Sequence, residues 1–130
     1  MDENSAISDY NEKLPEPYKP RALQILDLIN RALPEAESKV WHGHPVWFID
    51  GNPIAGYSLK KDGLEVLFWS GKSFQNPGLN PVGSFQAAGI IAHTDADLEK
   101  LGTWLGESKL IQWDYKNLPK KRTLEKLTNF

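Results

Sequence analysis

The residues best suited to chemistry in this chain of 130 residues lie within residues 41–48, Trp-His-Gly-His-Pro-Val-Trp-Phe. His42 and His44 are two positions apart, and in an extended strand such residues point to the same side, where two imidazoles could bind one metal ion. His93 with Asp95 or Asp97 could complete such a site only if folding brought them close. Pro45 instead favours a turn in which the histidines hydrogen-bond to backbone groups. We therefore assign no metal site to these histidines.

Residues 70–73, Ser-Gly-Lys-Ser, are similar to the end of a phosphate-binding P-loop. That motif needs a glycine five positions before Gly71, where this chain has Val66. It also needs a helix afterwards, whereas Pro77 and Gly78 follow here. A polar loop is the better interpretation of this segment.

No residue pattern in the chain is typical of a catalytic centre. None of the serines lies in a Gly-x-Ser-x-Gly elbow, which would present a nucleophile to its base. Asp50, Glu65 and Asp114 could supply paired carboxylates for acid–base catalysis only if folding brought them together, and nothing in their spacing predicts this. The sequence therefore does not predict an enzyme.

The aromatic residues are more informative. Five tryptophans are many for a chain of this length, and each needs a large packing partner and an acceptor for its indole N–H. Two interpretations stay open, a tryptophan-rich core and an aromatic pocket or docking surface with a few polar fixtures. For the second interpretation, the candidate ligand-binding residues are Trp41, His42, His44, Trp47, Tyr57 and Trp69.

Composition narrows the function classes. The net charge of −2 is not typical of a nucleic-acid binder, and the absence of cysteine excludes disulfides, thiolate metal sites and cysteine nucleophiles. Residues 1–12 lack the basic start and apolar run of a secretory signal, and no window approaches a membrane span. We expect a cytoplasmic monomer or weak dimer without a cofactor, which binds a small molecule or a protein partner and neither nucleic acid nor membrane.

The chain divides into three parts by polarity. We expect a flexible N-terminal arm over residues 1–19, a single domain over residues 20–118 and a basic C-terminal tail over residues 119–130. Within the domain, Pro20 suits the first turn of a helix whose apolar residues recur at helical spacing over residues 21–33.

Asp50-Gly51 and Asp62-Gly63 predict two tight hairpins, because such turns need positive φ. The expected strands of this meander cover residues 46–49, 54–60 and 64–69, with a short strand before them at residues 40–42.

The second half of the domain begins with a long loop rich in Gly, Pro and Asn over residues 70–84. A strand is expected over residues 85–92, and Thr94 is the expected cap of a helix that Gly106 breaks before a second helical piece at residues 109–117. The order predicts an α+β fold in which an antiparallel sheet, a meander plus a further strand, is covered by N- and C-terminal helices.

Residues 41–48, followed by Asp50-Gly51 and the apolar strand of residues 54–57, resemble the YdhG-like family of small bacterial domains of unknown function. Further similar runs are residues 68–71, 83–88 and 111–117, so that the likeness covers residues 18–117. The resemblance implies a compact α+β fold and no enzyme class.

Some members of that family are described as frataxin-like iron chaperones, so the resemblance gives an alternative function. Iron favours clustered carboxylate oxygens. On the first expected helix, Asp27 is the only acid, and the acids that do cluster are Glu35, Glu37, Asp95, Asp97 and Glu99. We keep a weak carboxylate iron site as the alternative, and a non-enzymatic binding domain with an aromatic pocket or docking surface as the leading hypothesis.

Overall fold

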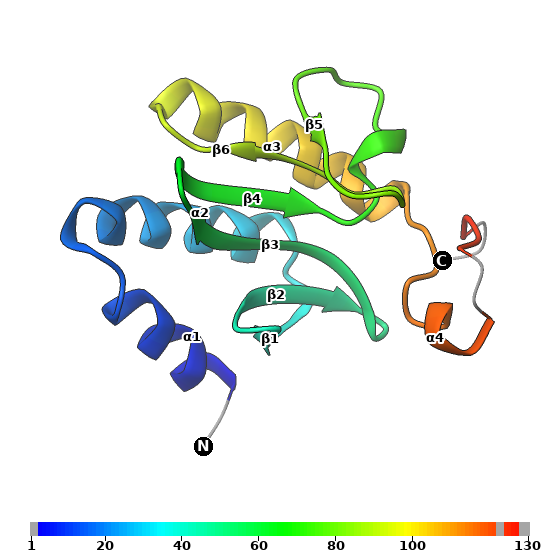
Figure 1. Cartoon of the computed structure of the whole chain (residues 1–130), viewed down its shortest axis with the longest axis horizontal. Helices are drawn as coiled ribbons and strands as arrows, with labels where there is room; N and C mark the ends of the chain where they lie inside the picture. Colours follow the sequence, from blue (N-terminus) through cyan, green and yellow to red (C-terminus); the bar gives the residue numbers. More distant parts are fainter. Residues whose placement is uncertain (1–2, 122–123, 128–130) are drawn as a thin grey trace.

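The structure is a computed structural model that describes residues 3–121 and 124–127. A six-stranded antiparallel sheet in the order β1-β2-β3-β4-β6-β5 forms one layer, and helices form the other (Figure 1). The strands are β1 (Glu37–Trp41), β2 (His44–Ile49), β3 (Asn52–Lys60), β4 (Gly63–Phe68), β5 (Asn80–Pro81) and β6 (Ala88–Ile91). The α-helices are α1 (Glu3–Glu12), α2 (Lys19–Ala32), α3 (Asp95–Leu110) and α4 (Leu118–Lys121), and two short 3₁₀ helices are η1 (Glu16–Tyr18) and η2 (Gly71–Ser73). The predicted α+β fold with an antiparallel sheet is confirmed.

Two tight turns build the first three strands. His42 and Gly43 join β1 to β2 with φ of 54° and 84°, and Asp50 and Gly51 join β2 to β3 with φ of 51° and 80°. Positive φ at both central residues is the geometry of a type I′ hairpin, which matches the twist of the strands. The Asp50-Gly51 hairpin is thus as predicted. A turn was expected near the histidines, but its form as a hairpin at His42-Gly43 was not, and β1 begins at Glu37 and is longer than the short strand expected at residues 40–42.

The third hairpin lies one residue earlier than predicted. Lys60 pairs with Gly63, so Lys61 and Asp62 are the turn residues and Gly63 begins β4. The β-strand pairing therefore fixed the register at this turn, and the Asp-Gly pair did not.

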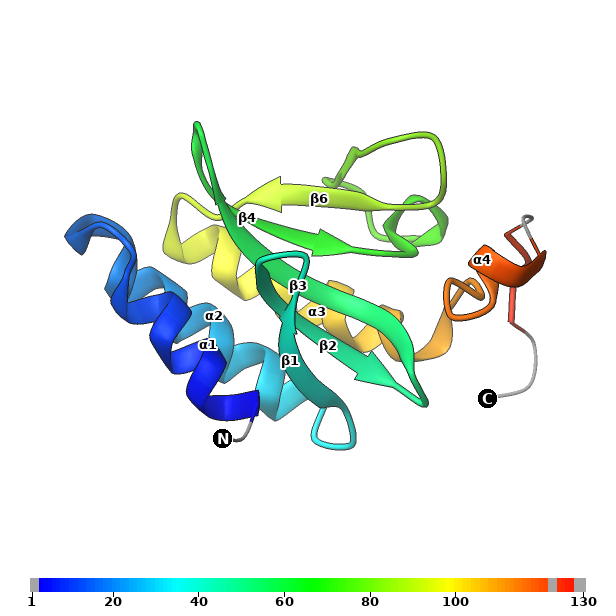
Figure 2. The ribbon, with the colours of Figure 1, turned by 60° about the horizontal axis from the view of Figure 1, so that its bottom comes forward.

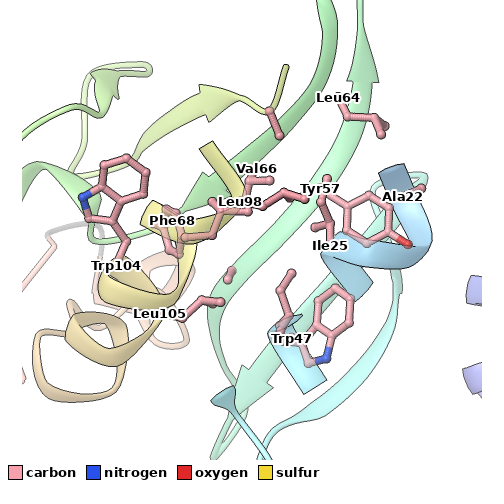
Figure 3. Packing of buried hydrophobic residues seen from close by; sticks show 14 of the residues in the cluster. Ala22, Ile25, Trp47, Tyr57, Leu64, Val66, Phe68, Leu98, Trp104 and Leu105 are labelled. Carbon is pink, nitrogen blue, oxygen red and sulfur yellow. The ribbon is translucent and has the colours of Figure 1, made fainter. Parts of the chain in front are cut away.

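Helices α2 and α3 cover the same face of the sheet, as Figure 2 shows with the strands in front of both. Their apolar stripes meet alternate residues of the strands, and Figure 3 shows Ile25 and Leu105 from the two helices on either side of this core. The buried residues that share the core are Leu14, Ala22, Ile25, Ile29, Leu33, Trp47, Ile54, Ala55, Tyr57, Leu64, Val66, Phe68, Ala92, Leu98, Leu101, Trp104 and Leu105. The opposite face of the sheet, here called the outer face, carries no helix from this core.

The expected flexible arm over residues 1–19 is wrong for the residues that the structure describes. Helix α1 packs against β1, β2 and α2, and it buries Ile7 and Asn11, while Leu14 is buried just after the helix. The sequence did not indicate this helix because its apolar residues are few, so that its stability depends on packing against the sheet.

The C-terminal part also differs from expectation. Helix α3 runs through Gly106 without a break and ends at Leu110, and residues 111–117 are not helical. Lys126, which follows α4, forms an isolated antiparallel bridge with Trp113, so part of the expected tail packs against the domain. Arg122 of that tail lies outside the described residues.

Among the described helices, none has the length and apolar character that crossing a membrane requires.

Candidate functional site

The sheet separates the six candidate residues into two groups. Alternation along β2 and β3 directs Trp47 and Tyr57 into the core beneath the helices. Trp41 at the end of β1 and Trp69 directly after β4 lie together on the outer face. The structure therefore does not bring the six residues into the single pocket considered above.

Trp47 and Tyr57 are sealed inside. Their exposed fractions are 0% and 1%, and their ring centroids lie 5.9 Å apart. The Trp47 indole Nε1 donates to Asn30 Oδ1 at 2.8 Å, and the Tyr57 hydroxyl donates to Asn11 Oδ1 at 2.6 Å. Burial raises the pKa of Tyr57 well above its usual range, so this hydroxyl stays protonated. Both side chains are buried and have their polar groups hydrogen-bonded within the protein. For these two residues, the structure therefore agrees with the interpretation as a tryptophan-rich core.

The outer face holds the other aromatic residues, here called the outer aromatic cluster: Trp41, His42, Phe48 and Trp69. Trp41 is the centre, with ring centroids 4.2 Å from His42, 5.3 Å from Phe48 and 6.3 Å from Trp69. Phe48 is buried, Trp41 and Trp69 are half-buried, and His42 is exposed. The cluster thus presents parts of two indole rings and one imidazole to the surface.

Gly56 of β3 lies close to Pro45 of β2 and beside the Trp69 ring. A Cβ atom on Gly56 would lie 2.6 Å from the Pro45 carbonyl oxygen and 3.4 Å from Cζ3 of Trp69. The tight approach is thus to the Pro45 carbonyl oxygen of the neighbouring strand, whereas the Trp69 ring lies at van der Waals distance from this position. The ring therefore lies over β3 on the outer face.

His44 borders the cluster at the start of β2. Its Nδ1 lies 3.4 Å from the Pro45 carbonyl oxygen, and burial lowers the pKa of the ring, with the positive charge of Lys60 and the neighbouring His42 adding to the effect. Within the described residues, no group of three or more His, Asp or Glu side chains could hold a metal ion. His42 contacts the Trp41 ring, and His44 pairs with Trp41 across the two strands.

The hollow beside the cluster is small. It has a volume of 90 Å³ and is lined by Glu37, Lys39, Phe48 and Gly51, with Lys39 Nζ 4.8 Å from the centroid of the Phe48 ring. Pockets for small molecules usually have volumes of about 300–1,000 Å³. This hollow is therefore smaller than the usual pocket for a small-molecule ligand.

Three of the five acids considered for iron have hydrogen-bond or ion-pair partners within the protein. Asp95 Oδ1 accepts a hydrogen bond from Arg21 at 2.9 Å. Asp97 closes a capping box with Thr94 at the start of α3, accepting from the backbone N–H of His93 and Thr94. Glu35 lies 3.7 Å from Lys109. Helix capping and ion pairing thus account for Asp95, Asp97 and Glu35, and the exposed acids Glu37 and Glu99 remain.

A buried polar network that the sequence reasoning missed closes one end of the sheet. The side chain of Asn52 donates to the Trp113 carbonyl at 2.9 Å and accepts from the Lys116 N–H at 3.0 Å. Ser70 Oγ accepts from the Trp113 N–H at 2.9 Å. These bonds hold residues 111–117, an irregular segment that ends in a turn, at the ends of β3 and β4. The signal in the sequence is the dense alternation of polar and aromatic residues in that run, which does not fit a helix stripe.

No family model matches the sequence, and no curated protein does either. Among solved structures, the crystal structure of YdhG from Bacillus subtilis, a protein of the DUF1801 family, matches with a TM-score of 0.55. The match covers 91% of this chain and 92% of that chain. This chain has the fold of YdhG. The resemblance to the YdhG-like family is confirmed as a shared fold, at a sequence identity of 17%.

Proposed function

We propose that the chain is a non-enzymatic binding domain whose outer aromatic cluster docks a protein partner. The observation that carries the proposal is the position of Trp41 and Trp69, which contact each other on the sheet face opposite α2 and α3. Tryptophan is enriched among the residues that contribute most to protein–protein binding, because it buries a large rigid surface. A protein occupant is favoured over a small molecule because the adjacent hollow holds only 90 Å³.

The surroundings of the cluster also suit a protein partner. Phe48 forms a buried base beneath Trp41, and Lys39 and Glu37 of the same strand border the hollow beside it. An apolar centre with charged groups at its border is the usual anatomy of a protein interface. The partner surface that fits is an apolar anchor with charged neighbours of both signs.

The test is a measured affinity. Immobilised protein captures partners from a cell extract, and the captured protein is then purified and titrated against wild type and Trp41→Ala/Trp69→Ala by calorimetry. We expect the double variant to bind at least 10-fold more weakly, because such anchors contribute about 1–2 kcal/mol or more each. Leu23→Ala is the matched control, since Leu23 is an exposed apolar residue of α2 on the other side of the molecule.

Equal binding by wild type and the double variant would exclude the outer face, and loss of binding in Leu23→Ala would move the interface to the helices. Sedimentation of the chain alone shows whether the partner is a second copy. In that case the association constant should fall in the double variant in the same way.

A further inference from the structure

The segment that joins β4 to β6 surrounds a second, larger hollow, whose lining includes no residue of the outer aromatic cluster. Its volume is 360 Å³, and its lining includes Lys72, Phe74, Pro77, Leu79, Pro81 and Ala88. This volume falls within the range of about 300–1,000 Å³ that is usual for small-molecule sites. We propose that this hollow is a binding site for a small organic carboxylate with an apolar body.

The loop around the hollow is held in one shape from several sides. Glu107 of α3 accepts hydrogen bonds from the N–H of Gln75 at 2.7 Å and of Asn76 at 3.3 Å, and from the Asn76 side chain at 2.9 Å. The Trp104 indole donates to the Asn76 carbonyl at 3.1 Å. One wall of the hollow is thereby tied to the last turns of α3.

The rest of the loop is tied to residues 111–117. The Trp113 indole donates to Ser73 Oγ at 2.9 Å, and the N–H of Gln86 donates to the Tyr115 hydroxyl at 3.0 Å. A segment rich in Gly and Pro that is fixed by distant side chains has already lost the conformational freedom that binding would otherwise remove. The hollow is therefore formed before any ligand arrives, and long ordered loops of this type often carry function.

The lining indicates the class of ligand. Among the described residues that line the hollow, Lys72 is the one with a charge, and it lies beside apolar surfaces from Phe74, Leu79 and two prolines. Lys72 Nζ donates to the Gly83 carbonyl at 2.9 Å, which uses one of the three donors of an ammonium group. The two other donors suit a carboxylate, and the apolar surfaces suit a compact hydrocarbon body. This site lies apart from the outer aromatic cluster and does not depend on the function proposed for it.

Sodium benzoate is the probe that tests the proposal. Amide resonances of ¹⁵N-labelled protein are followed during titration with benzoate, with the neutral benzamide and with inorganic phosphate. We expect saturable benzoate shifts centred on Gly71, Gly78 and Ala88, with a Kd of about 1–10 mM, as a ligand of this size allows. Benzamide and phosphate should each bind at least 5-fold more weakly, because one lacks the charge and the other the apolar body.

Variants of the lysine complete the test. Lys72→Met should weaken benzoate binding at least 5-fold, whereas Lys72→Arg, which keeps the charge, should bind within 3-fold of wild type. Lys61→Met is the matched control, since Lys61 is an exposed lysine in the turn at the opposite end of β4. The amide spectrum of each variant shows directly whether the fold is kept. The proposal is overturned by an absence of saturable shifts at these amides, by equal binding of benzamide or phosphate, or by unchanged binding in Lys72→Met.

Discussion

Trp47 and Trp41 have the same side chain and lie on neighbouring strands, yet they belong to different parts of the protein. Trp47 is 0% exposed and its indole N–H bonds to Asn30, whereas Trp41 is half-buried against Phe48 and Trp69. Burial and a satisfied polar group make Trp47 a core residue. Partial exposure beside other aromatic rings makes Trp41 a residue that a partner can contact.

Replacement of the two tryptophans should separate these roles. Trp47→Ala leaves a large cavity and an unpaired Asn30 side chain, so we expect a loss of about 3–5 kcal/mol in the free energy of unfolding. Trp41→Ala removes a half-buried ring, so the loss should be roughly half of that or less. Urea unfolding of the two variants measures both values. Equal losses would mean that Trp41 is as much a core residue as Trp47.

His44 should make stability depend on pH. Burial lowers the pKa of His44 in the folded protein, so the unfolded chain takes up a proton at a higher pH than the folded protein does. The stability from neutral His44 is therefore present above the usual histidine pKa of about 6.5 and is lost as the pH falls below it. In His44→Gln this loss between pH 7.5 and 5.5 should be smaller, as unfolding midpoints in urea will show. The same pH dependence in wild type and variant would refute the assignment.

The six candidate residues of the sequence analysis divide between the two faces of the sheet. Trp41, His42 and Trp69 lie together on the outer face and His44 borders them, and a binding role for these residues stays a prediction. Trp47 and Tyr57 were grouped with them, since composition alone does not tell which face of a strand a ring occupies. That depends on the register between β1, β2 and β3, which a bulge between Trp47 and Phe48 also shifts.

At the scale of elements, the sequence predicted those turns and helix caps that depend on a few adjacent residues. Asp50-Gly51 formed the expected hairpin, and Thr94 caps α3 as predicted. A second helical piece was expected over residues 109–117, but residues 111–117 are irregular, and hydrogen bonds to Asn52 and Ser70 hold them against the sheet. Those partners lie more than 40 positions away in sequence, so their effect depends on the tertiary structure.

The cap of α3 gives a test at this scale. Thr94 Oγ1 accepts from the Asp97 N–H at 3.2 Å within a capping box. Thr94→Ala should lower the free energy of unfolding by about 1 kcal/mol. Thr103→Ala makes the same replacement at an exposed position inside the same helix, where alanine is the better helix former, so it should raise stability slightly. If both variants behave alike in thermal unfolding, the cap does not contribute.

At the scale of the whole molecule, the sheet has one face covered by helices, here called the inner face, and an outer face that carries the proposed docking surface. Helices α1, α2 and α3 pack on or beside the inner face, and the outer face keeps the outer aromatic cluster. The general α+β arrangement followed from the order of elements, because helix stripes and paired strands must cover each other. The packing of α1 did not follow, since a helix with few apolar residues, such as Ile7, is not recognisable in the sequence without the strands that it contacts.

The ¹⁹F spectrum of protein labelled with 5-fluorotryptophan tests the central claim most directly, that the outer aromatic cluster is the docking surface. The five tryptophans are assigned by single replacements with phenylalanine. We predict that Trp41 and Trp69 show a solvent isotope shift between H₂O and D₂O and that both resonances move when the purified partner is added, while Trp47 does neither. Unchanged Trp41 and Trp69 resonances in the saturated complex would contradict the claim.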